Sequence, residues 1–225
     1  MTHALTLPQA LFLLGRDDAT GKPLGYHNRY IQPAGALTQL VMMGRLSLQP
    51  GRYGVVDVLS TAPTGSHYLD TILARVAASS RPRHMQHWIS CLSGMRGRVR
   101  MIGEELAAKG IVEEIPDKIL GLFPVTRWVQ RRAGPKLSLT SDMMKILFNE
   151  SAEPNERMGS IIALANAGHL LKRNFDRARL RENKAHIKRL VKGKWPGAEA
   201  ANKTIQAVQA SIAATTVIIA SAGIT

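Results

Sequence analysis

The stretch STAPTGSHYLDTILARV, residues 60–76, shows the helical sequence pattern that dominates the whole chain. Its APTG segment at 62–65 has the composition of a turn, because proline and glycine interrupt regular structure. The apolar residues that follow recur at the i, i+3, i+4, i+7 spacing, which predicts a helix with one apolar face. These residues are Leu69, Ile72, Leu73 and Val76. The stretch therefore predicts a turn that leads into an amphipathic helix.

Helical patterns dominate on both sides of this stretch. Thr6 can cap an N-terminal helix that has Pro8 in its first turn and an apolar run at 10–14. Similar patterns predict helices at 36–43, 84–92, 97–109, 141–149, 155–174, 176–192 and 198–222. We therefore expect a mostly α fold, a compact helical bundle domain surrounded by amphipathic helices, in a single domain over residues 1–225.

Strand patterns are confined to two places. RLSLQPGRYGVVDVLS at 45–60 predicts two short strands around a turn at Pro50 and Gly51. Between 111 and 139, the apolar runs KILGLF (118–123) and VTRWV (125–129) flank Pro124. We expect this second region to form a short β-hairpin insertion or an extended arm.

Cys91 is the only cysteine of the chain, which excludes an internal disulfide and any zinc site built on several cysteines. A single cysteine fits a reducing compartment. Cys91 lies among apolar residues, and cysteine is among the most often buried residue types, so we expect a buried structural thiol.

Neither end of the chain predicts a signal peptide or a membrane span. The N-terminal apolar run is short and has no basic region before it. Residues 205–225 contain no charged residue, but polar residues such as Gln206 and Gln209 interrupt them, whereas a spanning helix needs about 20 predominantly apolar residues. We therefore expect the helix at 198–222 to be a buried helix of the bundle.

The net charge is the strongest functional indication. The chain has 30 Lys plus Arg against 16 Asp plus Glu, a formal charge of +14, yet 45% of its residues are hydrophobic, as in a folded domain. Self-repulsion destabilises such a body, which indicates a polyanionic partner. Nucleic acid, an anionic membrane surface and an acidic protein are the candidates.

The basic residues gather in two stretches, of which the first is rich in arginine. Arginine presents a planar fork that grips a phosphate in a bidentate manner, and lysine does not. On a helix, Lys184, Lys188 and Lys192 of the second stretch would share one stripe. The first stretch holds Arg81, Arg83, Arg96, Arg98 and Arg100; the second holds Lys172, Arg173, Arg177, Arg179, Arg181, Lys184, Lys188, Arg189, Lys192 and Lys194.

No catalytic motif is present. The sequence lacks GxSxG, HExxH, a P-loop and GxGxxG. His84 and His87 have a spacing that a metal could use, but no further ligand is indicated nearby. We therefore expect neither an enzyme nor a cofactor or metal site.

Several segments, in order along the chain, resemble the Golgi phosphoprotein 3 family, which includes bacterial homologues. The most specific is STAPTGSHYLD at 60–70, with Ala-Pro-Thr-Gly followed by Leu-Asp. The others are LTLPQALFLLG (5–15), MGRLSL (43–48), WISCLSG (88–94), LAAKGIVEE (106–114) and IALANAGHLLKRNF (162–175).

The resemblance implies a helical domain whose projecting β-hairpin, here 111–139, serves in self-association as a homo-oligomer. Eukaryotic members are peripheral membrane proteins rather than enzymes. They bind phosphatidylinositol 4-phosphate in a basic surface pocket and act as adaptors for Golgi glycosyltransferases. The resemblance therefore implies a cytoplasmic protein on the cytosolic face of a membrane. Its partners would be an anionic phospholipid or phosphoinositide and a client protein, with no nucleic acid.

The family's pocket maps only partly onto this chain. Counted back from Lys109, Arg96 falls on the first of two family arginines, and Val99 stands at the second. Pro33 and Leu24 stand where the family has a further arginine and a tryptophan.

Neighbouring residues can substitute at these positions. We expect Arg98 or Arg100 to replace the second arginine, Arg29 to replace the third, and Tyr26 or Tyr30 to replace the tryptophan. The candidate headgroup-binding residues are Arg96, Arg98, Arg100 and Arg29.

A nucleic-acid-binding protein is the alternative. The helix at 36–43 followed by the strands at 45–60 resembles part of a winged helix, and a basic face suits phosphates. Against this, the segment AGALTQLVMM (34–43) offers almost no side chains that read bases.

We predict that Arg96→Ala weakens binding to anionic liposomes more than Lys192→Ala does, because only arginine grips a phosphate with two parallel bonds. Co-sedimentation with liposomes of varied headgroup composition measures this. If Lys192→Ala weakened binding more than Arg96→Ala, the headgroup pocket would not lie at Arg96.

Overall fold

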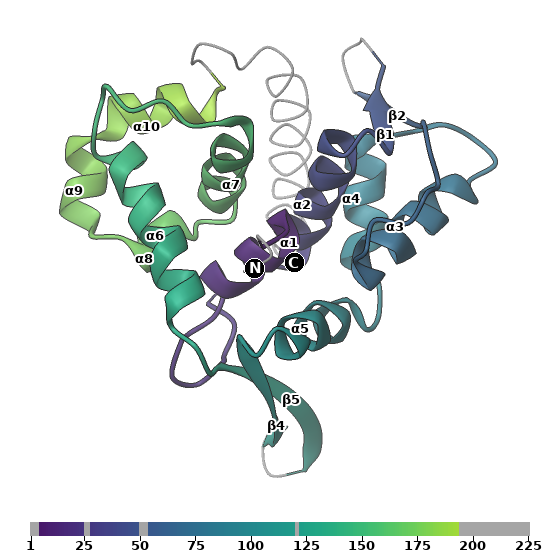
Figure 1. The fold of residues 1–225 in the computed structure, drawn as a ribbon, viewed down its shortest axis with the longest axis horizontal. Coiled ribbons are helices and arrows are strands. Elements are labelled where there is room, and N and C mark those ends of the chain that lie inside the picture. The colour runs from purple at the N-terminus through teal and green to yellow at the C-terminus, as the bar shows by residue number, and fades with distance from the viewer. Residues whose placement is uncertain (1–4, 25–27, 50–53, 120–121, 194–225) are drawn as a thin grey trace, which may run out of the picture.

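The computed structural model describes residues 5–24, 28–49, 54–119 and 122–193, and it confirms a mostly α fold with short β elements (Figure 1). Its helices are α1 (Leu7–Leu14), α2 (Asn28–Met42), α3 (His67–Ala77), α4 (Met85–Ser93), α5 (Arg98–Ala108), α6 (Gly134–Leu147), α7 (Glu156–Ala167), α8 (Leu171–Asn174), α9 (Arg177–Glu182) and α10 (Lys184–Val191). Its strands are β1 (Leu46–Leu48), β2 (Val55–Val58), β3 (Arg83–His84), β4 (Val112–Ile119) and β5 (Phe123–Gln130).

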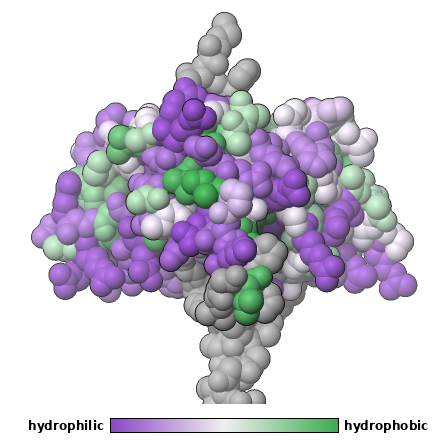
Figure 2. Space-filling view, turned by 90° about the horizontal axis from the view of Figure 1, so that it is seen from below, coloured by the Kyte–Doolittle hydropathy of each residue, from purple (hydrophilic) through white to green (hydrophobic). Residues whose placement is uncertain are grey.

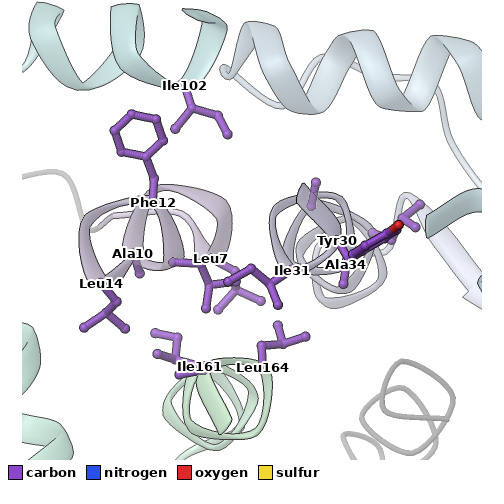
Figure 3. Close-up of a cluster of buried hydrophobic side chains, with 14 of the residues drawn as sticks. Leu7, Ala10, Phe12, Leu14, Tyr30, Ile31, Ala34, Ile102, Ile161 and Leu164 are labelled. Carbon is purple, nitrogen blue, oxygen red and sulfur yellow. The ribbon is translucent and has the colours of Figure 1, made fainter. Parts of the chain in front are cut away.

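Helix α1 is the centre of the fold. All of its residues are buried, and it lies between the α2–α5 and α6–α10 parts of the molecule (Figure 1). Figure 3 shows Phe12 pointing toward Ile102 of α5, while Leu7 lies near Ile161 and Leu164 of α7. A helix that is apolar on every side must be surrounded by other elements, so α1 organises the packing of its neighbours.

The N-terminus of α1 has the predicted cap. The Thr6 hydroxyl accepts a hydrogen bond from the Gln9 backbone N–H at 3.4 Å, and the Gln9 side chain accepts one from the Thr6 N–H at 3.2 Å. This reciprocal capping box satisfies backbone donors that would otherwise be left without partners inside the protein.

Glu105 of α5 connects α1, α3 and α5. One carboxylate oxygen accepts from the Ser66 hydroxyl at 2.7 Å and from the Tyr68 backbone N–H at 3.0 Å. The other accepts from the Gln9 side-chain amide at 2.8 Å. Ser66 is also the N-cap of α3, so the carboxylate lies at the positive end of that helix dipole, where negative charge is stabilising.

The APTG turn supports the same junction. Asp70, in the first turn of α3, accepts hydrogen bonds from the Thr64 backbone N–H at 2.8 Å and from the Thr64 hydroxyl at 2.7 Å. These bonds hold the turn against the helix. The stretch at 60–70 therefore has a structural role, because it places Ser66 and Tyr68 beside Glu105.

The two strands predicted within 45–60 are present, while the turn predicted at Pro50 and Gly51 lies outside the described residues. β1 and β2 pair antiparallel, with Leu46 opposite Val58, and β3 adds to the other side of β2. β4 and β5 form a separate two-stranded hairpin that projects from the body (Figure 1). Viewed from the side toward which it projects, the surface is mostly hydrophilic, with apolar side chains near the middle (Figure 2).

Trp128 of β5 anchors the hairpin to α5. Its side chain is 2% exposed, and a Cβ atom added at Gly103 would lie 2.3 Å from its indole ring. Only glycine at position 103 allows the indole to lie this close to the helix backbone. The hairpin is thus held at its base by packing against α5.

The turn and the limits of the hairpin differ from the prediction. Pro124 does not separate the strands but lies within β5, opposite Lys118. Proline is tolerated there because both strands of a two-stranded sheet are edge strands. The arm also ends at Gln130 rather than 139, and α6 begins at Gly134 rather than 141, with Pro135 in its first turn, where proline is favourable.

Helix α2 is longer than expected. It begins at Asn28 rather than 36 and continues through Pro33. A proline inside a helix removes one backbone hydrogen bond. Because Pro33 argues against a helix at this point, the predicted helix began too late, at residue 36. Tertiary packing of Ile31, Ala34 and Leu37, all 0% exposed, outweighs that loss.

Two helices that were predicted as continuous are divided. The segment at 155–174 breaks after α7, where His169 has φ 57° and the N–H groups of His169 and Leu170 bond to Asn166 O and Ala165 O. This is the Schellman end of a helix. The segment at 176–192 divides at Asn183 into α9 and α10.

The prediction that Cys91 is buried is wrong, because its thiol is exposed. The buried face of α4 is formed by Met85, Trp88, Ile89 and Leu92 at the helical i, i+3, i+4, i+7 spacing. Cys91 falls outside that stripe. Apolar neighbours in the sequence do not indicate which face of the helix a residue occupies.

The predicted helix at 198–222 lies outside the described residues. Among the helices that are described, none combines the length and the apolar character needed to cross a bilayer.

We predict that Glu105→Ala lowers the free energy of unfolding by about 3 kcal/mol, because buried donors on Ser66 and Gln9 lose a charged acceptor. Urea denaturation followed by circular dichroism measures this. Glu104→Ala is the matched control, since it removes only an exposed ion pair with Arg100, worth about 0.5 kcal/mol. Equal losses in the two variants would contradict the central role of Glu105.

Candidate functional site

The candidate site lies at the beginning of α5. Gly97 caps the helix in the left-handed region, at φ 77°, and has no side chain to satisfy the first backbone donors. Arg98 is the first residue of the helix, and its Nη1 donates to Met95 O at 3.4 Å. Because the N-terminal end of a helix attracts anions, its uncapped donors and Arg98 favour negative charge at this point.

Arg98 lies close to Tyr68 of α3 and Arg29 of α2. Burial lowers the pKa of Arg98, the neighbouring Tyr68 raises it, and the positive charge of Arg29 lowers it further. Burial likewise raises the pKa of Tyr68, partly countered by Arg98. Two guanidinium groups from distant parts of the sequence therefore lie within electrostatic range of each other, and that of Arg98 also lies within range of a buried phenol.

Neither arginine forms an ion pair with an acidic residue in the described part of the chain. The guanidinium of Arg29 is exposed and lies 5.1 Å above the ring of Tyr30. Arg98 Nε and the Tyr68 hydroxyl are buried without a hydrogen-bond partner among the described residues. A phosphate could accept hydrogen bonds from both guanidinium groups.

Further buried polar atoms occur on the neighbouring helices. Gln32 Oε1 lies on α2, one turn after Arg29, and Trp88 Nε1 lies on α4. Neither has a partner in the part of the chain that the structure describes. Buried polar atoms in native proteins are normally hydrogen-bonded, and besides these atoms of α2 to α5 only Arg16 Nε is likewise buried without a partner among the described residues.

The structure brings together two of the four predicted arginines. Arg96 lies two residues before Arg98, in the exposed turn that leads into α5. Arg100 is about 200° around the helix from Arg98 and pairs with Glu104 at 2.7 Å. Arg29 and Arg98 thus form the arginine pair, and Arg100 is directed elsewhere.

Sequence reasoning missed Tyr68. The residue lies within the 60–70 stretch, but nothing in its spacing indicates that α3 places it against the start of α5. For the predicted aromatic position, Tyr30 is 7% exposed and lies beneath Arg29, and Tyr26 lies outside the described residues.

The second basic stretch forms an exposed surface on α8, α9 and α10. The predicted lysine stripe is confirmed, because Lys184, Lys188 and Lys192 are exposed while Ile187 and Leu190 are buried. Asp176 caps α9 through the Arg179 N–H, and Arg189 lies 3.8 Å from Glu150. Other exposed basic residues of this surface are Lys172, Arg173, Arg177 and Arg181.

The described residues contain no cluster of three or more His, Cys, Asp or Glu that could hold a metal ion. The helix predicted at 36–43, which would be the recognition helix of a nucleic-acid-binding protein, is the C-terminal half of α2. Ala36, Leu37 and Leu40 are 0% exposed, so this face of the helix packs in the core and cannot enter a DNA groove.

The fold and the site together define a basic, mostly helical domain with a projecting hairpin and a surface arginine pair. A family model described as Golgi phosphoprotein 3 (GPP34) matches residues 7–208. This match covers most of the 225 residues, and the chain belongs to the Golgi phosphoprotein 3 family. A search of curated proteins finds no matching protein.

We predict that Tyr68→Phe leaves the free energy of unfolding unchanged or raises it by up to about 1 kcal/mol, because the removed hydroxyl is buried without a partner. Thermal and urea denaturation measure this. A clear loss of stability would show that the hydroxyl has a stabilising partner in the folded protein.

Proposed function

We propose that this protein is a non-enzymatic peripheral membrane protein that binds the phosphate of an anionic lipid headgroup through Arg29 and Arg98 and acts as an adaptor. The observation that carries the proposal is that the charge of Arg29 on α2 acts on Arg98 at the start of α5. Arg98 also interacts with Tyr68, and neither arginine forms an ion pair with acidic residues in the described chain.

The physical basis is charge compensation. The positive charges of Arg29 and Arg98 repel each other, and burial weakens the hydration of Arg98. A phosphate between them would relieve both effects and accept strong, charge-assisted hydrogen bonds. Arg96, exposed in the adjacent turn, lies near enough in sequence to contact the same headgroup.

The surface on α8–α10 would add attraction without selecting a headgroup. Each basic side chain near an anionic leaflet contributes about 1 kcal/mol. Several together support reversible attachment, while the arginine pair supplies selectivity for phosphate. Family membership supports this assignment.

The identity of the lipid, the membrane face, self-association and the client protein are part of the same proposal. Phosphatidylinositol 4-phosphate is the lipid that the family resemblance favours, and the protein would act on the cytosolic face of a membrane. The exposed hairpin β4–β5 would serve in self-association, and a client protein would be bound as cargo or partner. Nucleic acid is not among the proposed partners.

We predict that Arg98→Ala and Arg29→Ala each weaken binding to vesicles that carry a phosphorylated headgroup by about tenfold, as expected for loss of one charge-assisted hydrogen bond or more. Arg75→Ala is the matched control, because Arg75 is an exposed arginine near the end of α3. Vesicle co-sedimentation measures the change, and circular dichroism verifies folding.

Two outcomes would overturn the proposal. One is equal binding of the wild-type protein to neutral and anionic vesicles. The other is a gel shift on duplex DNA that falls with salt and exceeds vesicle binding, which would favour the nucleic-acid alternative.

A further inference from the structure

A cleft of about 940 Å³ opens at the other end of α5, away from the arginine pair. It lies between Leu5, the end of α5, the exit of the hairpin and the first turns of α6 and α7. Lys109 is eleven positions after Arg98, so the two sites are roughly 16 Å apart along the helix axis. They are therefore separate sites.

Three cationic side chains line this cleft, from positions far apart in the sequence: Lys109, Arg132 and Arg157. Their hydrogen bonds go to neutral acceptors. Lys109 Nζ donates to Gln9 Oε1 at 2.9 Å, Arg132 donates to Gly110 O at 3.0 Å and to Lys109 O, and Arg157 donates to Leu5 O.

None of these cations pairs with a carboxylate among the described residues. The acidic side chain on the wall, Asp142, pairs with Lys145 at 2.9 Å. Burial lowers the pKa of Arg157, which means that its positive charge is poorly hydrated. Three cations around one cleft, none of them paired with a carboxylate, make the cleft electropositive, and such a field favours an anionic ligand.

The beginning of α6 adds to the positive field. Ala133, its N-cap, makes no side-chain capping bond, and Ala133, Gly134 and Pro135 all line the cleft. A helix begins with backbone donors that have no partner within the helix, and here those donors add to the field of Arg132 and Arg157.

The rest of the lining is largely apolar. Ile111, Leu139 and Met158 are 5%, 6% and 9% exposed, and each contributes to the wall. A site of this size with apolar walls and a few convergent polar groups has the character of a small-molecule pocket. It would suit a ligand that has both an anionic group and an apolar body.

We propose that this cleft binds a small amphipathic anion, with its carboxylate or phosphate held by Arg132, Arg157 and Lys109 and its apolar chain against Ile111, Leu139 and Met158. The inference does not rest on the proposed headgroup function, since it uses other residues at the opposite end of α5.

The test is isothermal titration calorimetry of the full chain without membranes, with decanoate below its micellar concentration as the probe. Decanol supplies the chain alone and acetate the charge alone; decyl phosphate and inorganic phosphate form the parallel pair. We expect decanoate to bind at least tenfold more tightly than decanol or acetate, and decyl phosphate to behave in the same way.

Variants locate the site. Arg157→Gln should weaken decanoate binding by tenfold or more, and Arg157→Lys, which keeps the charge but loses the guanidinium fork, should weaken it less. Arg98→Ala should bind decanoate as the wild type does. The Arg157 variants should also keep wild-type affinity for anionic vesicles, which separates failure of this site from failure of the headgroup site.

The proposal is overturned if decanol binds as tightly as decanoate, if acetate or inorganic phosphate matches its long-chain partner, or if both Arg157 variants keep wild-type affinity while remaining folded. Since Arg157 also holds Leu5, thermal unfolding of each variant without ligand is the folding control. Should Arg157→Gln unfold, Arg157→Lys and Leu139→Asp, which places a charge on the apolar wall, must each weaken decanoate binding.

Discussion

The hydrogen bonds accepted by Glu105 are the constraint on which much of this structure depends. One carboxylate joins the side chain of Gln9 in α1, the N-cap Ser66 and the backbone of Tyr68 in α3, and its own helix α5. Gln9 also takes part in the cap of α1 and accepts from Lys109. The central apolar helix is therefore held in register by polar contacts at its N-terminal end.

Fixing α5 in this way places its two ends against different parts of the molecule. At its beginning, Arg98 lies within electrostatic range of Tyr68 and Arg29. At its end, Lys109 joins the cleft that Arg132 and Arg157 line. Between them, Gly103 receives the indole of Trp128 and so sets the base of the hairpin. One helix thus positions both proposed anion sites and the projecting arm.

Local patterns predicted much of the fold correctly. The cap at Thr6, the paired strands at 45–60 and the apolar face of α3 all depend on neighbours in sequence, and all are present. The errors concern features that depend on distant contacts. The helix predicted at 36–43 begins at Asn28 instead, because core packing carries α2 through Pro33. Cys91 is exposed, because the buried face of α4 excludes it.

The amino-acid sequence alone predicts a basic, mostly helical domain, and the order of its characteristic segments indicates the family that the match over residues 7–208 establishes. Composition and periodicity are enough for this, since they depend only on residue type and spacing. Which cations lie near one another, by contrast, depends on the tertiary structure. The fold brings Arg98 within electrostatic range of Arg29, turns Arg100 toward Glu104, and gathers Lys109, Arg132 and Arg157 around one cleft. The physical reason is that interaction between charges depends on distance and burial, and folding brings together residues that are far apart along the chain.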